Sequence, residues 1–152
     1  MPRTIIGSIT SAGSWFIAQG ELEDLPTFVR GRAGLGDLRE HPALSTRLTI
    51  RWDYACNDDG LPDAEASSAL EAFENTVVSA LESDGLAILT IVFTHGGCRL
   101  WTLYASDIEE VSRRLNEVLP HDPPLPIQMS AEEDPSWNEY RKLIEGTGAG
   151  DS

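Results

Sequence analysis

The stretch that decides the fold is GLAILTIVFTHGGCRLWTLY, residues 85–104. Residues 86–94 carry no formal charge and are rich in Ile, Val, Leu, Phe and Thr, which suit a buried pleated strand. Gly96 and Gly97 follow, and glycine supplies the positive φ angles that a tight hairpin turn requires. A second apolar run with Trp101 and Tyr104 completes the pattern, which predicts a β-hairpin at the centre of a sheet.

The strand predicted before this hairpin alternates strictly over residues 45–55, as is typical of a strand with one side in the core. Its apolar face holds Leu48, Ile50, Trp52 and Tyr54, and its polar face holds Arg47, Thr49, Arg51 and Asp53. Residues 14–20 and 26–32 are predicted to add two earlier strands, and residues 1–12 to be frayed or to form a short edge strand.

Two helices are predicted to cover this sheet. Residues 63–83 would form the first, with Asp63 as its N-cap and one apolar stripe. The stripe consists of Ala66, Ala69, Leu70, Phe73, Val77, Ala80 and Leu81. Ser106 would cap the second helix, which would bury Ile108, Val111 and Leu115.

The C-terminal part is predicted to hold one more strand and a short helix. Residues 125–130 alternate and suit an edge strand, because Pro126 cannot donate to a ladder. Residues 132–135 would open a third helix whose Trp137 and Tyr140 share a face that docks on the domain. Residues 146–152 are small and polar and are predicted to be a disordered tail.

The predicted order from residue 45 to residue 130 is strand, helix, strand, strand, helix, strand. This order indicates an α+β fold, a ferredoxin-like βαββαβ two-layer sandwich, here with extra N-terminal strands and a short C-terminal helix. Because no linker, repeat or low-complexity block interrupts the chain, residues 1–145 are predicted to form a single domain.

Composition restricts the possible partners and surroundings. The 152 residues carry a formal net charge of -14, and phosphate binding needs Lys and Arg, so nucleic acid and anionic membranes are disfavoured as partners. No apolar stretch reaches the roughly 18 residues of a membrane span, and the N-terminus lacks the apolar run of a secretory signal. Cys56 and Cys98 lack the spacing of a metal site or disulfide scaffold, which favours a cytoplasmic protein with reduced thiols.

Several short motifs over roughly residues 15–143 resemble one family. They are His41-Pro42, Trp52 with Tyr54, Gly60-Leu61-Pro62, the hairpin residues Thr94, Gly97, Arg99, Trp101 and Tyr104, and Asp134-Pro135-Ser136-Trp137-Asn138-Glu139-Tyr140. Together they resemble the bacterial domain of unknown function 695 (DUF695), with the last motif the most specific. That family has no established activity and is distantly similar to an acidic bacterial protein inhibitor of ribonuclease E. The resemblance thus implies a ferredoxin-like fold and an analogy for function.

Candidate catalytic and metal-binding residues are few. His95 and Cys98 flank the hairpin turn, but no further ligand lies nearby in the sequence, and nothing indicates an activated thiol. His41 and His121 stand beside prolines in predicted loops. A turn explains the pair at residues 58–59, and the preference of a helix N-terminus for anions explains the acids at residues 132–134. We therefore expect no cofactor and no metal, and these residues favour a non-enzymatic protein over an enzyme.

Two other groups of residues have open alternatives. Arg47, Arg51, Arg99 and Trp101 are predicted to share the sheet face away from the helices, where they would bind a ligand or stack nucleic-acid bases. Alternatively they pair with acids or lie under the N-terminal strands and the C-terminal helix, which the net negative charge favours. The aromatic residues would either line a pocket or fill the core. These residues are Trp52, Tyr54, Trp101, Tyr104, Trp137 and Tyr140; we expect core positions for Trp52 and Tyr104, and leave Trp137 and Tyr140 open.

The leading candidate surface is acidic. Residues 57–84 hold eight acidic residues and no Lys or Arg, so the first helix would present a face of one sign. We expect Asp63, Glu71, Glu74 and Glu82 to bind an arginine- or lysine-rich protein segment. The predicted function is therefore an acidic cytoplasmic binding or regulatory module acting through protein–protein contacts. A small enzyme or ligand-binding domain, and a single-stranded nucleic-acid binder, are the alternatives.

Overall fold

A computed structural model of the protein describes residues 9–12, 15–22, 25–32, 44–54, 58, 60–82, 85–119 and 126–147. Within these residues the elements follow in the order β1 (Ile9–Ala12), β2 (Trp15–Leu22), β3 (Leu25–Arg32), β4 (Thr46–Asp53), α1 (Ala64–Glu82), β5 (Ala87–His95), β6 (Cys98–Ala105), α2 (Ile108–Val118), β7 (Ile127–Glu133) and α3 (Asn138–Thr147).

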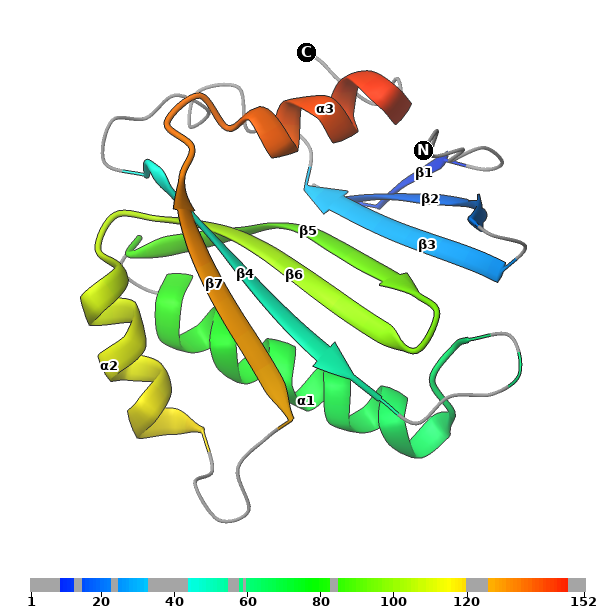
Figure 1. The fold of residues 1–152 in the computed structure, drawn as a ribbon, viewed down its shortest axis with the longest axis horizontal. Coiled ribbons are helices and arrows are strands. Elements are labelled where there is room, and N and C mark those ends of the chain that lie inside the picture. The colour runs from blue at the N-terminus through cyan, green and yellow to red at the C-terminus, as the bar shows by residue number, and fades with distance from the viewer. Residues whose placement is uncertain are drawn as a thin grey trace.

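The described strands form one seven-stranded sheet in the order β1-β2-β3-β5-β6-β4-β7. Every neighbouring pair is antiparallel. Figure 1 shows α1 and α2 together against one face of this sheet, while α3 lies apart from them near the strand ends. The structure is therefore mixed α+β, with its helices on both sides of an antiparallel sheet.

The predicted central hairpin is confirmed. In the pairing of β5 with β6, Thr94 lies opposite Arg99 and His95 lies opposite Cys98. The turn residues Gly96 and Gly97 have φ angles of 58° and 88°, the left-handed conformations for which glycine is best suited. Because β5 has β3 on one side and β6 on the other, the uncharged run lies inside the sheet.

The main core lies between the sheet and the two long helices. Leu48, Ile50 and Trp52 of β4 are buried there, as their alternation predicted. Phe73 of α1 packs edge-on against Trp52, with 5.2 Å between ring centroids, which confirms the predicted face of the first helix. Ala69 is exposed instead of buried, because the stripe of α1 is narrower than predicted.

A second cluster lies on the other face of the sheet, under α3. Its buried members are Ala18, Val29, Leu44, Ile91, Tyr104, Trp137 and Tyr140. Trp137 stacks on Tyr104 with ring centroids 4.3 Å apart and planes 14° apart. The predicted docking of the last helix on the domain is thereby confirmed, and α3 covers part of the sheet face that α1 and α2 leave open.

The C-terminal boundaries differ from the prediction. Residues 132–133 end β7, where Glu133 pairs with Thr46, and do not begin a helix. The side chain of Asp134 accepts hydrogen bonds from the backbone N–H groups of Asn138 and Glu139, so α3 begins after this carboxylate. The helix then runs to Thr147 and includes residues assigned to the tail, while residues 148–152 lie outside the described part.

The start of α2 also differs by one residue. Asp107, and not Ser106, is the N-cap, because its carboxylate accepts from the backbone N–H groups of Glu109 and Glu110. The hydroxyl of Ser106 instead donates to the carbonyl of Leu86, at the beginning of the central hairpin. Two adjacent residues with capping side chains cannot be ranked by residue type alone, since both types are favoured at this position.

Candidate functional site

The four acidic residues expected to bind a partner on α1 have two kinds of environment. Asp63 is exposed and is the predicted N-cap, with its Oδ1 2.8 Å from the backbone nitrogen of Ala66. Glu71 is exposed on the outer side of the helix. Glu74 and Glu82 are each turned toward the sheet and pair with arginines of β3.

Glu74 lies at the junction of three elements. Its Oε1 accepts from Arg30 of β3 at 2.6 Å and from the indole nitrogen of Trp101 of β6 at 3.0 Å. Burial alone would raise the pKa of this carboxyl, but the hydrogen bonds from Arg30 and Trp101 outweigh it and hold the pKa below its ordinary value. Glu74 therefore stays ionised and pairs with Arg30 of β3 within the chain.

Glu82, which lies further along α1, also pairs with an arginine of β3. Its Oε1 lies 3.3 Å from Arg32 Nη1, and its Oε2 accepts from the backbone nitrogen of Leu89 at 2.8 Å. The expectation of a continuous, single-signed surface on α1 is therefore wrong at Glu74 and Glu82, because both carboxylates pair with cations from β3. Spacing along the helix reveals only partners within the helix, whereas Arg30 and Arg32 come from a strand more than forty residues earlier.

The four residues expected to share the open sheet face do not do so. Trp101 lies opposite Ile50 and Arg99 opposite Trp52, so both side chains are on the face covered by α1. Trp101 is buried against Phe73, with 4.9 Å between their ring centroids. Arg47 and Arg51 lie on the opposite face, since they alternate with Ile50 and Trp52 along β4.

The arginines of the open face are engaged by neighbouring acids. Arg51 pairs with Asp53 at 2.9 Å on the exposed surface. Arg47 is mostly buried, and it binds Glu132 and Asp134 through separate guanidinium nitrogens. The alternative of pairing with acids is thus confirmed for both residues.

The aromatic residues that were considered as a pocket lining belong to the two cores. Tyr54 and Trp101 are buried in the cluster between the sheet and α1, together with Trp52. Trp137 and Tyr140 are buried with Tyr104 under α3. Burial on this scale is the ordinary role of aromatic side chains in a domain of this size.

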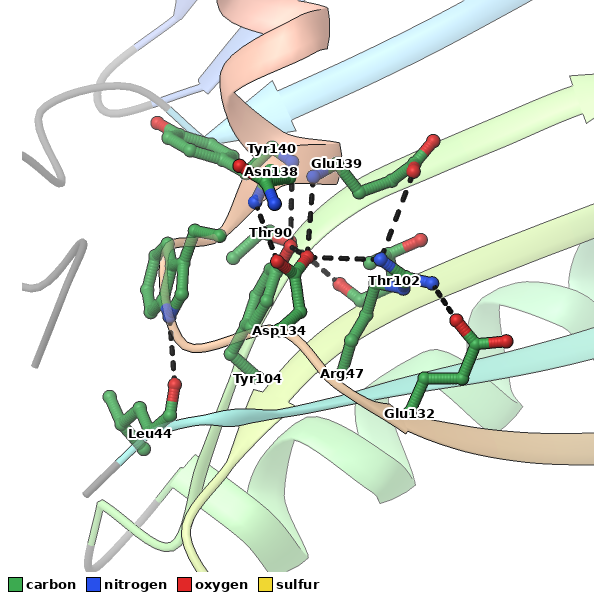
Figure 2. A network of polar contacts seen from close by, with 11 residues as sticks. Leu44, Arg47, Thr90, Thr102, Tyr104, Glu132, Asp134, Asn138, Glu139 and Tyr140 are labelled. Carbon is green, nitrogen blue, oxygen red and sulfur yellow. Dashed lines mark hydrogen bonds and ion pairs between the residues drawn. The ribbon is translucent and has the colours of Figure 1, made fainter. Parts of the chain in front are cut away.

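A polar network around Asp134 was not among the predicted sites (Figure 2). Its Oδ2 accepts from Tyr104 Oη at 2.8 Å and from Arg47 Nη1 at 2.9 Å, and its Oδ1 accepts from the backbone of Asn138 at 2.8 Å. A further bond comes from the backbone of Glu139. The sequence signal was the motif from Asp134 to Tyr140, whose resemblance to a family and whose aromatic face were recognised, whereas the role of its first residue, Asp134, was not.

The chemistry of Asp134 indicates a structural role. Burial would raise the pKa of its carboxyl, but the surrounding donors, led by the Asn138 N–H, hold the pKa below its ordinary value. Burial and this carboxylate raise the pKa of Tyr104, which therefore keeps the proton that it donates. Asp134 accepts four hydrogen bonds from its own chain, three at Oδ2 and one at Oδ1, so its carboxylate connects β4, β6 and the start of α3.

The histidine and cysteine of the hairpin turn lie directly opposite each other in the β5–β6 ladder. His95 is buried, and its Nδ1 lies 3.3 Å from the hydroxyl of Thr27. Burial raises the pKa of Cys98, which is the opposite of what activates a thiol. His41, Cys56, Asp59 and His121 lie outside the described residues, and within those residues no group of three or more His, Cys, Asp or Glu side chains is placed to hold a metal ion.

Comparison with known proteins identifies a family. Residues 13–144 match the model of a family of unknown function, DUF695. No curated protein and no solved structure matches the chain. Among the helices of the described residues, none is long and apolar enough to cross a membrane.

Proposed function

Because this chain belongs to the DUF695 family, whose function is unknown, we propose a function from the geometry of its own residues. We propose that the protein is a non-enzymatic binding module that attracts a basic protein segment to its exposed carboxylates. The observation that carries this proposal is that most described arginines form ion pairs within the chain, whereas several carboxylates are exposed to solvent.

Most arginines of the described residues form ion pairs within the chain. Ion pairs within the chain engage Arg30, Arg32, Arg47, Arg51, Arg113 and Arg114. By contrast, Glu65 and Glu71 of α1 and Glu133 of β7 are exposed. Exposed carboxylates such as these, in a chain with a net charge of -14, attract cationic partners and repel phosphate.

The same proposal includes finer statements about fold and setting. The elements from β4 to β7 follow in the order β-α-β-β-α-β, and their spatial order β5-β6-β4-β7 supports a ferredoxin-like unit extended by β1, β2 and β3. We propose that this unit acts in the cytoplasm of a bacterium. The distant similarity to the acidic inhibitor of ribonuclease E, inferred from the sequence, is an analogy that points to the same kind of partner contact.

The test is affinity capture with the intact protein from nuclease-treated extract, at about 0.1 M and about 1 M salt. Over this range the Debye length falls from about 10 Å to about 3 Å, so contacts between exposed charges should weaken strongly. A Glu65→Gln/Glu71→Gln bait should recover less of the same proteins, while the control Glu117→Gln, which alters a carboxylate already paired with Arg113, should not. Recovery that ignores both salt and these substitutions, or recovery of nucleic acid before nuclease treatment, would contradict the proposal.

A further inference from the structure

Within the described residues, the last strand of the sheet, β7, has a partner strand on one side only. Among the described strands it pairs with β4, from Thr46 opposite Glu133 to Trp52 opposite Ile127. It ends the strand order opposite β1, and Figure 1 shows it as the outermost strand on that side. An edge strand presents a row of backbone N–H and C=O groups that another extended chain can use.

The register shows which backbone groups face outward. The backbone nitrogen of Asp134 donates to the carbonyl of Ser45 at 2.8 Å, so the pair that continues the ladder beyond Glu133 is a hydrogen-bonded pair. In an antiparallel ladder such pairs alternate with pairs whose N–H and C=O groups point away. Gln128, Ser130 and Glu132 therefore bond to β4, whereas the backbone groups of Met129, Ala131 and Glu133 point outward.

The side chains around this edge leave it accessible. Residues 128–133 are all exposed, and Met129 keeps 47% of its surface, which is high for a large apolar residue. Met129 and Ala131 lie in the same row as Ile127, and Glu133 ends that row with a charge. Natural sheets guard their edges with proline and charge, and here Pro126 and the two glutamates stand at the ends, while residues 128–131 carry neither.

We propose that β7 binds an extended, basic segment of a partner protein as an additional antiparallel strand. This inference rests on the proposed function and names the form that the basic segment takes. Opposite Glu133 the segment carries Arg or Lys, and opposite Ala131, Met129 and Ile127 it carries apolar residues. Read from its N-terminus, the segment begins with Arg or Lys, and after it every second residue is apolar.

Charge selects this occupant over a second copy of the chain. Each copy has a net charge of -14, so pairing two β7 strands would bring two strongly negative molecules together. A cationic segment gains from the same field, and opposite charges directly across a ladder stabilise the pairing. The backbone bonds provide much of the affinity, and the row from Ile127 to Glu133 provides the register.

The experiment uses the intact, isotope-labelled protein and the synthetic peptide Arg-Thr-Val-Thr-Val-Thr-Val. In the free protein the amides of Met129, Ala131 and Glu133 should exchange quickly, and those of Gln128, Ser130 and Glu132 slowly. Saturating peptide should protect the first set. Ala131→Pro removes an outward N–H and keeps every bond to β4, so it should weaken binding at least tenfold, about 1.4 kcal/mol, without changing the unfolding midpoint.

A charge exchange provides the second, fold-independent variant. Glu133→Arg should weaken binding of this peptide and restore binding of the same peptide with Glu in place of its Arg. Peptide binding that persists in Ala131→Pro and shifts the amides of Glu65 and Glu71 would overturn the β7 site and leave the proposed function standing. Amides of Met129 and Ala131 that are already protected in a concentration-dependent dimer would also overturn it. No peptide binding, together with salt-sensitive capture of basic proteins, would reject β7 alone; loss of both would reject the proposed function as well.

Discussion

Arg30 of β3 and Glu74 of α1 are 44 residues apart in the sequence, and their side chains meet at 2.6 Å. The same carboxylate oxygen accepts from Trp101 Nε1 at 3.0 Å, so a single side chain connects the N-terminal extension, the first helix and the central hairpin. This contact changes the role of α1. The sequence predicted that Glu74 would bind a partner protein, but its carboxylate instead connects α1 to β3 within the chain.

Replacing Glu74 tests this role. Glu74→Ala removes the carboxylate that accepts from Arg30 and from the buried indole N–H of Trp101, and should lower the free energy of unfolding by about 1–3 kcal/mol. The matched control is Glu71→Ala on the exposed side of the same helix, which should change it by no more than about 0.5 kcal/mol. Urea unfolding measures both. Equal effects of the two substitutions would refute the internal role of Glu74.

The Asp134 carboxyl predicts an acid-dependent loss of stability. Its folded-state pKa lies below the ordinary value of 3.8, so the unfolded chain takes up this proton at a higher pH than the folded chain does. The stabilisation is therefore fully present above about pH 4–5 and is lost as the pH falls through the folded-state pKa. Asp134→Asn should be less stable than the natural protein at neutral pH, and the difference should shrink in acid. A difference that stays constant from neutral pH into acid would contradict this account.

The contact between Gly60 and Gly96 predicts a severe steric effect. A Cβ at position 60 would lie 2.9 Å from the Gly96 Cα, and Gly60 has a φ of +80°. Gly85 has a φ of +79° but no atom within 4 Å of its Cβ position, so it isolates the cost of backbone conformation. Gly85→Ala should cost about 1–2 kcal/mol, and Gly60→Ala clearly more, because the hairpin turn must also move. Thermal unfolding of the two variants that gives equal midpoints would refute the close contact.

Trp137 should be the main anchor of α3. Its side chain is fully buried, its indole nitrogen donates to the carbonyl of Leu44 at 2.8 Å, and its backbone has the uncommon φ of 55°. Trp137→Ala should cost about 3–5 kcal/mol, whereas Trp137→Phe keeps the stack on Tyr104 and should cost about 1–2 kcal/mol. Denaturant unfolding distinguishes them. Wild-type stability in Trp137→Ala would make α3 a free element instead of a docked one.

The sequence by itself determined the features that depend on neighbouring residues. Alternation along β4 identified Ile50 and Trp52 as buried, and three- and four-residue spacing identified Leu70 and Phe73 on α1. Gly96 and Gly97 marked the hairpin turn, because few other residues adopt positive φ angles without strain. The boundary of α3 was missed, since acids before a helix resemble its first turn and only the pairing of Glu133 with Thr46 assigns them to a strand.

Only the tertiary structure decided what the charges do. Glu71 and Glu74 are the same residue type three positions apart on one helix, yet one is exposed and the other binds Arg30 and Trp101. Likewise Asp134 could be assigned to a buried network only once Arg47 and Tyr104 were placed beside it. Local spacing determines which face of an element a side chain occupies. The residue that it contacts on that face comes from a distant part of the chain. Which residue this is depends on the order of the strands in the whole sheet.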